Sequence, residues 1–319
     1  MLILGEIVLG FLLLFIGGEA IVRSAIKISE KLNISKALVG LTIVSYATSA
    51  PEMLISVIAA LDDHHEIALG NVIGSNITNT LLIFGLCAII QPVKITKKSV
   101  NFDFRYLLIA NIALILFSTL GVISRFEGFM LFVMLIIYTY VTGKLSYKSQ
   151  DLLQNDVDTM QTPLKLKLSL ITAFGLLILS VALLVGGSKL LVMGCVSLAL
   201  KFDIPQSVIA VTVIAIGGSA PEISTSVIAS LKKHSDLAVS NIIGSNIFNI
   251  LGVIGITSLV NPISTISTTL SSFDIWIMLA SALVIFAIGY YFNQISKKVG
   301  AFLLFLYLSY LCWEISLIL

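Results

Sequence analysis

Residues 45–52 read SYATSAPE, and residues 70–79 read GNVIGSNITN. The same pattern returns 170 residues later, as AIGGSAPE at 215–222 and SNIIGSNIFN at 240–249. The surrounding alignment extends without a gap over 52 positions, of which 22 are identical. The identities gather on polar residues, where an apolar composition alone would not place them. The chain therefore contains an internal duplication with a glutamate in the middle of each copy.

The composition places this duplication in a membrane. Apolar residues make up 58% of the chain and charged residues only 11%, and the mean hydropathy is +1.07. Apolar runs of about 18 to 25 residues recur along the whole chain, each long enough to cross a hydrocarbon core. The runs are continuous, whereas a β-barrel shows short alternating segments. The basic residues lie in the predicted loops, so the net charge of +2 gives no indication of nucleic-acid binding.

The apolar runs predict ten membrane spans, near residues 3–25, 36–61, 66–91, 104–122, 126–144, 166–190, 205–230, 236–260, 272–292 and 299–318. The 170-residue offset maps the second span onto the seventh and the third onto the eighth. Each half then has five spans, and an odd number forces the two halves into opposite orientations. We predict an all-α integral membrane protein of ten transmembrane helices in two inverted-topology five-helix repeats. Its halves are residues 1–145 and 165–319, joined by a polar linker at 146–164.

The basic residues predict how the chain lies in the bilayer. With the N-terminus outside, sixteen lysines and arginines fall in inner loops, and only Arg125 and Lys201 fall in outer ones. An excess of basic residues marks the cytoplasmic side. The two homologous hairpin loops differ accordingly, since DDHHE at 62–66 is acidic and KKH at 232–234 is basic. We expect a multi-pass protein of the cell membrane with both termini outside and the linker on the inner face.

Glu52 and Glu222 carry the functional argument. A carboxylate near the bilayer centre costs about 2.5–3.5 kcal/mol even on lenient insertion scales, so such residues are functional by default. The spans place no lysine or arginine at comparable depth, because Lys189 is expected near the end of its span. Mobile cations are then the expected counter-charges. Pro51 and Pro221 break the helix just before each acid, which frees backbone carbonyls for a cavity or an ion.

A polar stripe accompanies each acid in the next span. Ser75 and Asn79 in one copy, like Ser245 and Asn249 in the other, lie four residues apart on one helical face. We predict that these four residues belong to the site. Four further amides either join the site or hold helices together, namely Asn71, Asn76, Asn241 and Asn246. All of these groups offer oxygen, which suits Na⁺, Ca²⁺ and Mg²⁺ rather than zinc or copper.

Charge counting indicates exchange rather than one-way transport. Two carboxylates balance one divalent cation or two to three monovalent ones. An empty site would leave both charges unpaired in a medium of low dielectric constant, so crossing without cargo is penalised. A carrier that crosses only when loaded is an antiporter, here of Ca²⁺ against Na⁺ or H⁺. A cation channel would not need this balance, and a non-transporting scaffold would leave both glutamates unexplained.

The motifs resemble those of the calcium/cation antiporter superfamily, specifically the prokaryotic type of its sodium/calcium exchanger branch. The family pattern is G-[TS]-S-x-P-E with G-N-x-x-G-S-N-x-x-[ND]. The resemblance implies that Glu52 and Glu222 bind Ca²⁺ and Na⁺ competitively and that spans 1 and 6 slide as the gate. It further implies side-chain ligands from Ser49, Ser75, Asn79, Ser219, Ser245 and Asn249, and carbonyl ligands from Ser45, Thr48, Ala215 and Gly218. It implies no cofactor, no catalytic residue, no enzymatic activity and no obligate protein partner.

The chain departs from the family pattern at three positions, and none of these departures removes a charged ligand. Gly218 stands where the second motif has threonine, Ala47 replaces a glycine, and Ser240 replaces the glycine of Gly-Asn. Potassium-dependent branches carry aspartate at the position of Asn249, so asparagine argues against K⁺ co-transport. An H⁺/Ca²⁺ antiporter remains the alternative, although Ser-Ala-Pro-Glu does not match the first motif of the proton branch. A Na⁺-coupled exchanger of another divalent cation also remains open.

Overall fold

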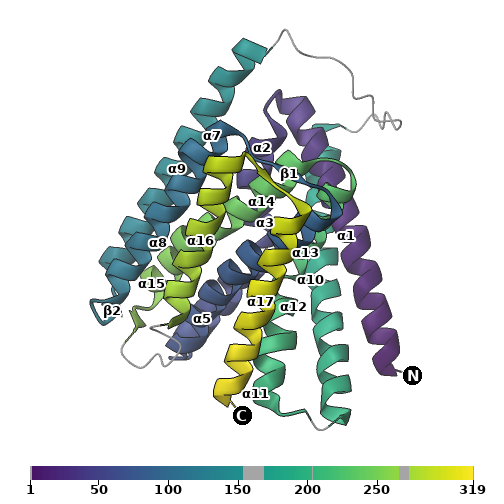
Figure 1. Ribbon diagram of the computed structural model, residues 1–319, viewed down its shortest axis with the longest axis vertical. Helices are drawn as coiled ribbons and strands as arrows, with labels where there is room; N and C mark the ends of the chain where they lie inside the picture. The colour runs from purple at the N-terminus through teal and green to yellow at the C-terminus, as the bar shows by residue number, and fades with distance from the viewer. Residues whose placement is uncertain (1, 154–168, 203, 266–272, 319) are drawn as a thin grey trace.

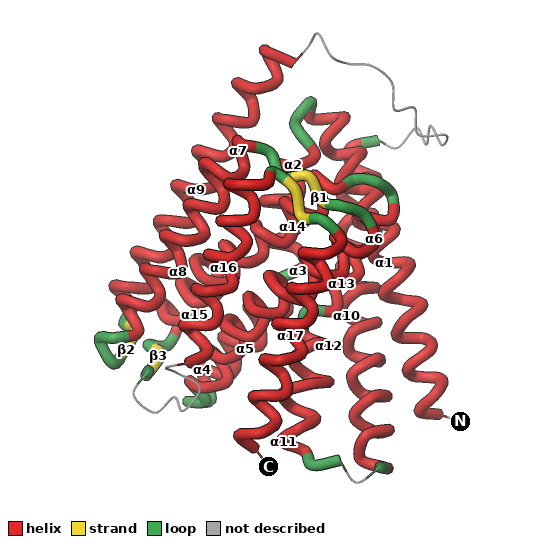
Figure 2. The backbone as a smooth tube through the Cα atoms, viewed as in Figure 1, coloured by secondary structure: helices red, strands yellow, loops and turns green. Residues whose placement is uncertain are grey.

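The computed structural model describes residues 2–153, 169–202, 204–265 and 273–318, and these are almost entirely helical (Figures 1 and 2). The elements of the first half are α1 (Leu2–Leu32), α2 (Lys36–Val39), η1 (Gly40–Val44), α3 (Ser45–Thr48), α4 (Ala50–Leu61), α5 (His65–Ile77), η2 (Thr78–Ile83), α6 (Phe84–Ile90), β1 (Val93–Lys94), α7 (Lys97–Ser99), η3 (Val100–Phe104), α8 (Arg105–Ser118), β2 (Val122–Ile123) and α9 (Arg125–Leu153). Segments labelled η are π-helical.

The second half repeats this order. Its elements are α10 (Leu170–Lys201), α11 (Gln206–Ile209), η4 (Ala210–Ile214), α12 (Ala215–Gly218), α13 (Ala220–Leu231), α14 (Ser235–Phe248), η5 (Asn249–Ile254), α15 (Gly255–Val260), β3 (Ile263–Ser264), α16 (Phe273–Phe292), β4 (Gln294–Ile295) and α17 (Lys297–Ile318). Within the described residues, eight helices are long and apolar enough to cross a membrane, and two bent pairs bring the number to ten if each pair is one span. The predicted ten-span, all-α fold is confirmed.

The two bent pairs are the predicted broken helices. The chain turns by 42° between Thr48 and Ala50 and by 60° between Gly218 and Ala220. Each proline lies in the first turn of the second piece, where its missing N–H costs nothing, and its ring prevents the first piece from continuing. Each glutamate therefore lies in the first turn of a helix near the middle of the molecule.

Several boundaries differ from the prediction. Helix α1 has 31 residues and α10 has 32, so each is roughly 45 Å long at a rise of 1.5 Å per residue and exceeds the hydrocarbon thickness. We placed the end of the sixth span near residue 190, and that boundary was wrong because apolar residues continue to Lys201. Helix α9 runs to Leu153, into the region expected to be linker. Residues 154–164 of that linker lie outside the described residues.

Two short antiparallel strand pairs join the halves. Strand β1 pairs with β4, and β2 pairs with β3, so each pair takes one strand from each half. Helices α1 and α10 also pack closely, since a Cβ added at Gly10 would lie 2.7 Å from the backbone nitrogen of Leu191. Figure 1 shows both chain termini at the same end of the molecule, as a chain with ten spans requires.

Candidate ion-binding site

The two broken helices bring Glu52 and Glu222 into the centre of the bundle. Each residue is only 1% exposed. The Ser49 hydroxyl donates to Oε1 of Glu222 at 3.0 Å, so a serine of one repeat reaches the acid of the other. Both acids lie at helix N-termini, whose partial positive charge favours an anion. That the two acids together bind an ion stays a prediction.

Many oxygens of the predicted ligands lack a hydrogen-bond partner. In the described part of the chain, these buried, unpartnered atoms include both carboxylate oxygens of Glu52, Oε2 of Glu222, Oδ1 of Asn79 and Asn249, and Oγ of Ser219 and Ser245. Leaving a buried acceptor unpaired costs about 1–3 kcal/mol, and more for a charged group. Buried oxygens without donors suit a dehydrated cation, which replaces the missing hydrogen bonds with coordination.

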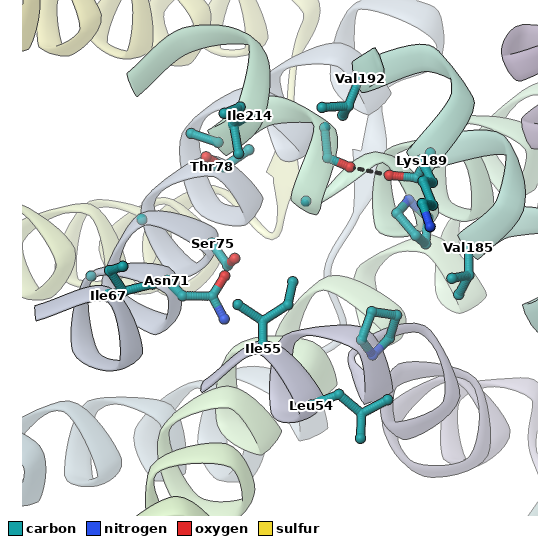
Figure 3. Close-up of a pocket in the computed structure, with 18 of the residues that line it drawn as sticks. Leu54, Ile55, Ile67, Asn71, Ser75, Thr78, Val185, Lys189, Val192 and Ile214 are labelled. Carbon is teal, nitrogen blue, oxygen red and sulfur yellow. Dashed lines mark hydrogen bonds between the residues drawn. The ribbon is translucent and has the colours of Figure 1, made fainter. Parts of the chain in front are cut away.

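A cavity of about 740 Å³ leads from one end of the molecule to this region. Its wall includes Pro51 and Pro221, which precede the two acids, and the predicted ligands Ser75, Ala215 and Gly218. Figure 3 shows Asn71, Ser75 and Thr78 of one repeat on one side of the cavity, with Val185, Lys189 and Val192 of α10 opposite. The cavity thus runs between α10 and the site, and we call it the vestibule.

The predicted carbonyl ligands fall into two different environments. Ser45 and Thr48 are buried, whereas Ala215 is exposed and Gly218 is half-buried on the vestibule wall. The Ser45 carbonyl already accepts hydrogen bonds from Thr48 Oγ1 at 3.2 Å and from the Ser49 nitrogen at 3.0 Å. The two copies are therefore asymmetric in this state, because Ala215 and Gly218 line the vestibule whereas Ser45 and Thr48 do not. The ligand roles of these four carbonyls stay a prediction.

Two of the ambiguous asparagines hold helices together. Asn71 donates to Ser56 Oγ at 2.9 Å and to the Glu52 carbonyl at 3.1 Å. Asn241 donates to Ser226 Oγ at 3.0 Å. Each bond ties the helix that carries the polar stripe to the helix that carries the acid. The helix-packing interpretation therefore applies to Asn71 and Asn241, and the bond to the Glu52 carbonyl places the stripe beside the acid.

The expectation for Lys189 was wrong. Helix α10 extends twelve residues beyond it to Lys201, so Lys189 lies within the span and on the vestibule wall. The predicted position near a helix end was wrong because the glycines and serine around Lys189 resemble a helix end, whereas α10 continues through them. A positive charge therefore faces the path to a site that we expect to bind cations.

The end opposite the vestibule is closed by α1. Ser224 Oγ donates to the Leu14 carbonyl at 2.5 Å, and a Cβ added at Gly18 would lie 2.6 Å from Ile228 Cδ1. Glu19 of α1 also accepts a hydrogen bond from Lys232, in the loop between α13 and α14. The repeat maps α1 and α13 onto α10 and α4, whose Val185 and Leu54 both line the vestibule. One repeat is thus closed where the other is open.

Known proteins share this sequence and architecture. The model of the family described as sodium/calcium exchanger protein matches residues 2–144 and 172–316. The chain is 37% identical over 250 residues to the putative antiporter CaxA of Alkalimonas amylolytica, and the match covers 76% of each protein. It is 28% identical over 276 residues to the sodium/calcium exchanger MaX1 of Methanosarcina acetivorans, covering 76% of this chain and 79% of the relative.

The fold also matches a solved exchanger. A structure of the sodium-calcium exchanger NCX_Mj superimposes with a TM-score of 0.81 at 27% sequence identity, covering 98% of both chains. That fold has ten helices in inverted repeats, as predicted for this chain. The family match covers both halves of the chain, and CaxA is more than 30% identical over most of it. The chain belongs to the sodium/calcium exchanger protein family.

Proposed function

We propose that this protein exchanges Na⁺ for Ca²⁺ across the cell membrane by alternating access to a site built on Glu52 and Glu222. The observation that carries the proposal is the pair of buried carboxylates, together with the unpartnered oxygens of the other predicted ligands. Two negative charges in a medium of low dielectric constant need counter-charge to cross the membrane. One Ca²⁺, or two to three Na⁺, would provide it without a resident cofactor. The exchanger family and the relative MaX1 support Na⁺ as the coupling ion.

The asymmetry of the repeats supports alternating access. Because the repeats are inverted, closing α10 onto α4 and separating α1 from α13 would exchange the conformations of the two repeats. The resulting state would be open at the other end of the molecule. The bonds that would break include the one from Ser224 to the Leu14 carbonyl and the ion pair between Lys232 and Glu19. With the basic loops inside and both termini outside, the present vestibule faces the outer solution.

The direct test is Ca²⁺ uptake into proteoliposomes. An outward-directed Na⁺ gradient is expected to drive ⁴⁵Ca²⁺ uptake, and a pH gradient in the absence of Na⁺ is expected to drive none. A Na⁺ ionophore that collapses the gradient should stop the uptake, which separates exchange from leakage. Uptake that follows the pH gradient and ignores Na⁺ would establish the H⁺/Ca²⁺ alternative. If Mg²⁺ or another divalent cation, added in excess, is itself transported in place of Ca²⁺, then that cation is the cargo.

Lys189 yields a separate prediction. Lys189→Met removes a positive charge from the vestibule wall and keeps most of the side-chain length. We expect the KM for Ca²⁺ supplied to the vestibule side to fall about threefold at low ionic strength, because the local Ca²⁺ concentration rises. The difference should shrink as KCl is added. Lys201→Met, at the end of the same helix, is the control, and an unchanged or higher KM for Lys189→Met would contradict this role.

A further inference from the structure

Four asparagines form a chain of hydrogen bonds between the repeats. Asn79 Nδ2 donates to Asn246 Oδ1 at 3.0 Å, and Asn249 Nδ2 donates to Asn76 Oδ1 at 3.2 Å. The pairs are related by the duplication, so each stripe asparagine is held by an asparagine of the opposite repeat. Asn79 and Asn249 lie in the π-helical segments η2 and η5, a local geometry that is frequent at functional sites.

The bonds decide which end of each amide faces inward. An asparagine side chain has a donor end and an acceptor end, and a half-turn exchanges them. In Asn79 and Asn249 the donor end faces the other repeat, and Oδ1 is left buried without a partner. If either amide turned over, two oxygens would face each other across the repeat interface, and N–H groups would point into the site. An N–H group repels a cation.

Asn76 holds its orientation through a group that only accepts. Its Nδ2 donates to the backbone carbonyl of Asn246 at 3.3 Å and lies 3.6 Å from Met278 Sδ. A carbonyl cannot donate, so Asn76 cannot turn over, and its Oδ1 must face Asn249. The other pair is held less strictly, because Asn246 Nδ2 donates to the Thr80 hydroxyl at 2.8 Å. A hydroxyl can reverse its role, and the duplication replaces Thr80 with Ile250.

We propose that Asn76 and Asn246 are positioning residues that hold Asn249 and Asn79 with their oxygens toward the ion. This inference rests on the proposed function, because it assumes that Asn79 and Asn249 bind the transported cations. Asn76 and Asn246 do not themselves touch the ion. Their effect is on affinity and on the ratio of Ca²⁺ to Na⁺ binding, since reversing one amide removes one ligand oxygen and introduces a repulsive dipole.

The test is a double-mutant cycle on Asn76 and Asn249. Asn76→Leu removes the acceptor that orients Asn249, and we expect the KM for Ca²⁺ to rise about tenfold while kcat changes much less. Asn249→Asp is the second variant, because a carboxylate has oxygens at both ends and needs no orienting partner. In the Asn249→Asp background, Asn76→Leu should therefore raise the KM for Ca²⁺ much less than it does in the wild type. The logarithms of the KM changes are then non-additive.

The controls separate orientation from packing. Asn111→Leu makes the same change at a buried asparagine that bonds only to the Leu107 carbonyl of its own helix, and its KM should equal that of the wild type. Should Asn76→Leu not fold, Asn76→Ala removes the same acceptor without adding volume. Equilibrium Ca²⁺ binding to the purified full chain, measured by calorimetry, gives a readout that does not depend on transport.

The outcomes distinguish this inference from the proposed function. Additive effects in the cycle, or an Asn111→Leu variant with the same rise in KM, would overturn the positioning role while leaving the exchanger assignment intact. A wild-type protein that neither binds nor exchanges Ca²⁺ would overturn the proposed function itself. A tenfold rise in KM on Asn76→Leu that disappears when the same change is made in the Asn249→Asp background would establish that Asn76 acts through the orientation of Asn249.

Discussion

Glu52→Gln and Glu222→Gln are each expected to abolish Ca²⁺ exchange while leaving a folded protein. Glutamine keeps the shape of glutamate and removes its charge. With one carboxylate left, a bound Ca²⁺ would carry an unbalanced positive charge into the interior, and the loss of one charge-assisted ligand costs about 1.5–3 kcal/mol before that imbalance is counted. Na⁺-driven ⁴⁵Ca²⁺ uptake should therefore fall to the level of empty liposomes. Calorimetry should show at least a tenfold loss of Ca²⁺ affinity.

Glu127→Gln is the matched control for both variants. Glu127 lies in the first turn of α9, where it accepts hydrogen bonds from the Ser124 hydroxyl and backbone nitrogen, and glutamine can still accept them. Its exchange rate should equal that of the wild type. If Glu52→Gln or Glu222→Gln exchanged Ca²⁺ at near wild-type rates, that glutamate would be structural, and a site with two carboxylates would be wrong.

The second large effect is expected at Asn249. Asn249→Leu removes the buried Oδ1 and the donor to Asn76, and we expect it to abolish Ca²⁺ exchange. Asn249→Asp keeps an oxygen in the site but turns an oxygen toward Asn76 Oδ1. An aspartate that binds a proton can donate to Asn76 and relieve this repulsion. We therefore expect exchange by Asn249→Asp to depend on pH, with an altered Na⁺ dependence or a new dependence on K⁺, because the site gains a negative charge.

The measurement for Asn249 is Na⁺-driven Ca²⁺ uptake over a range of pH, Na⁺ and K⁺ concentrations. The wild type serves as the reference, and Asn111→Asp controls for the addition of a buried carboxylate in a neighbouring helix. If both Asn249 substitutions left the Na⁺ and Ca²⁺ dependence unchanged, Asn249 would only hold helices together, as Asn241 does.

Much of the architecture follows from the sequence because the signals are local. Apolar runs set the number of spans, since a membrane imposes a minimum length on each. The gap-free repeat and the odd number of spans per half require inversion. Pro51 and Pro221 required a break before each acid, and the bends of 42° and 60° lie there. The boundaries between the halves and the orientation in the membrane stay predictions.

By itself, then, the sequence determined the ten spans, the inverted repeat and the acids at its centre, because these depend on composition and on residues close together along the chain. The tertiary structure decided what depends on neighbours 160 to 200 residues away. Helical spacing places Asn71 and Asn79 on one face, but only packing shows that Asn71 holds its own repeat together while Asn79 contacts the other. The position of Lys189 on the vestibule wall depends on where α10 lies relative to α4. The closure of one repeat and the opening of the other is likewise a property of helix packing, since both copies carry the same Ser-Ala-Pro-Glu motif at the broken helix.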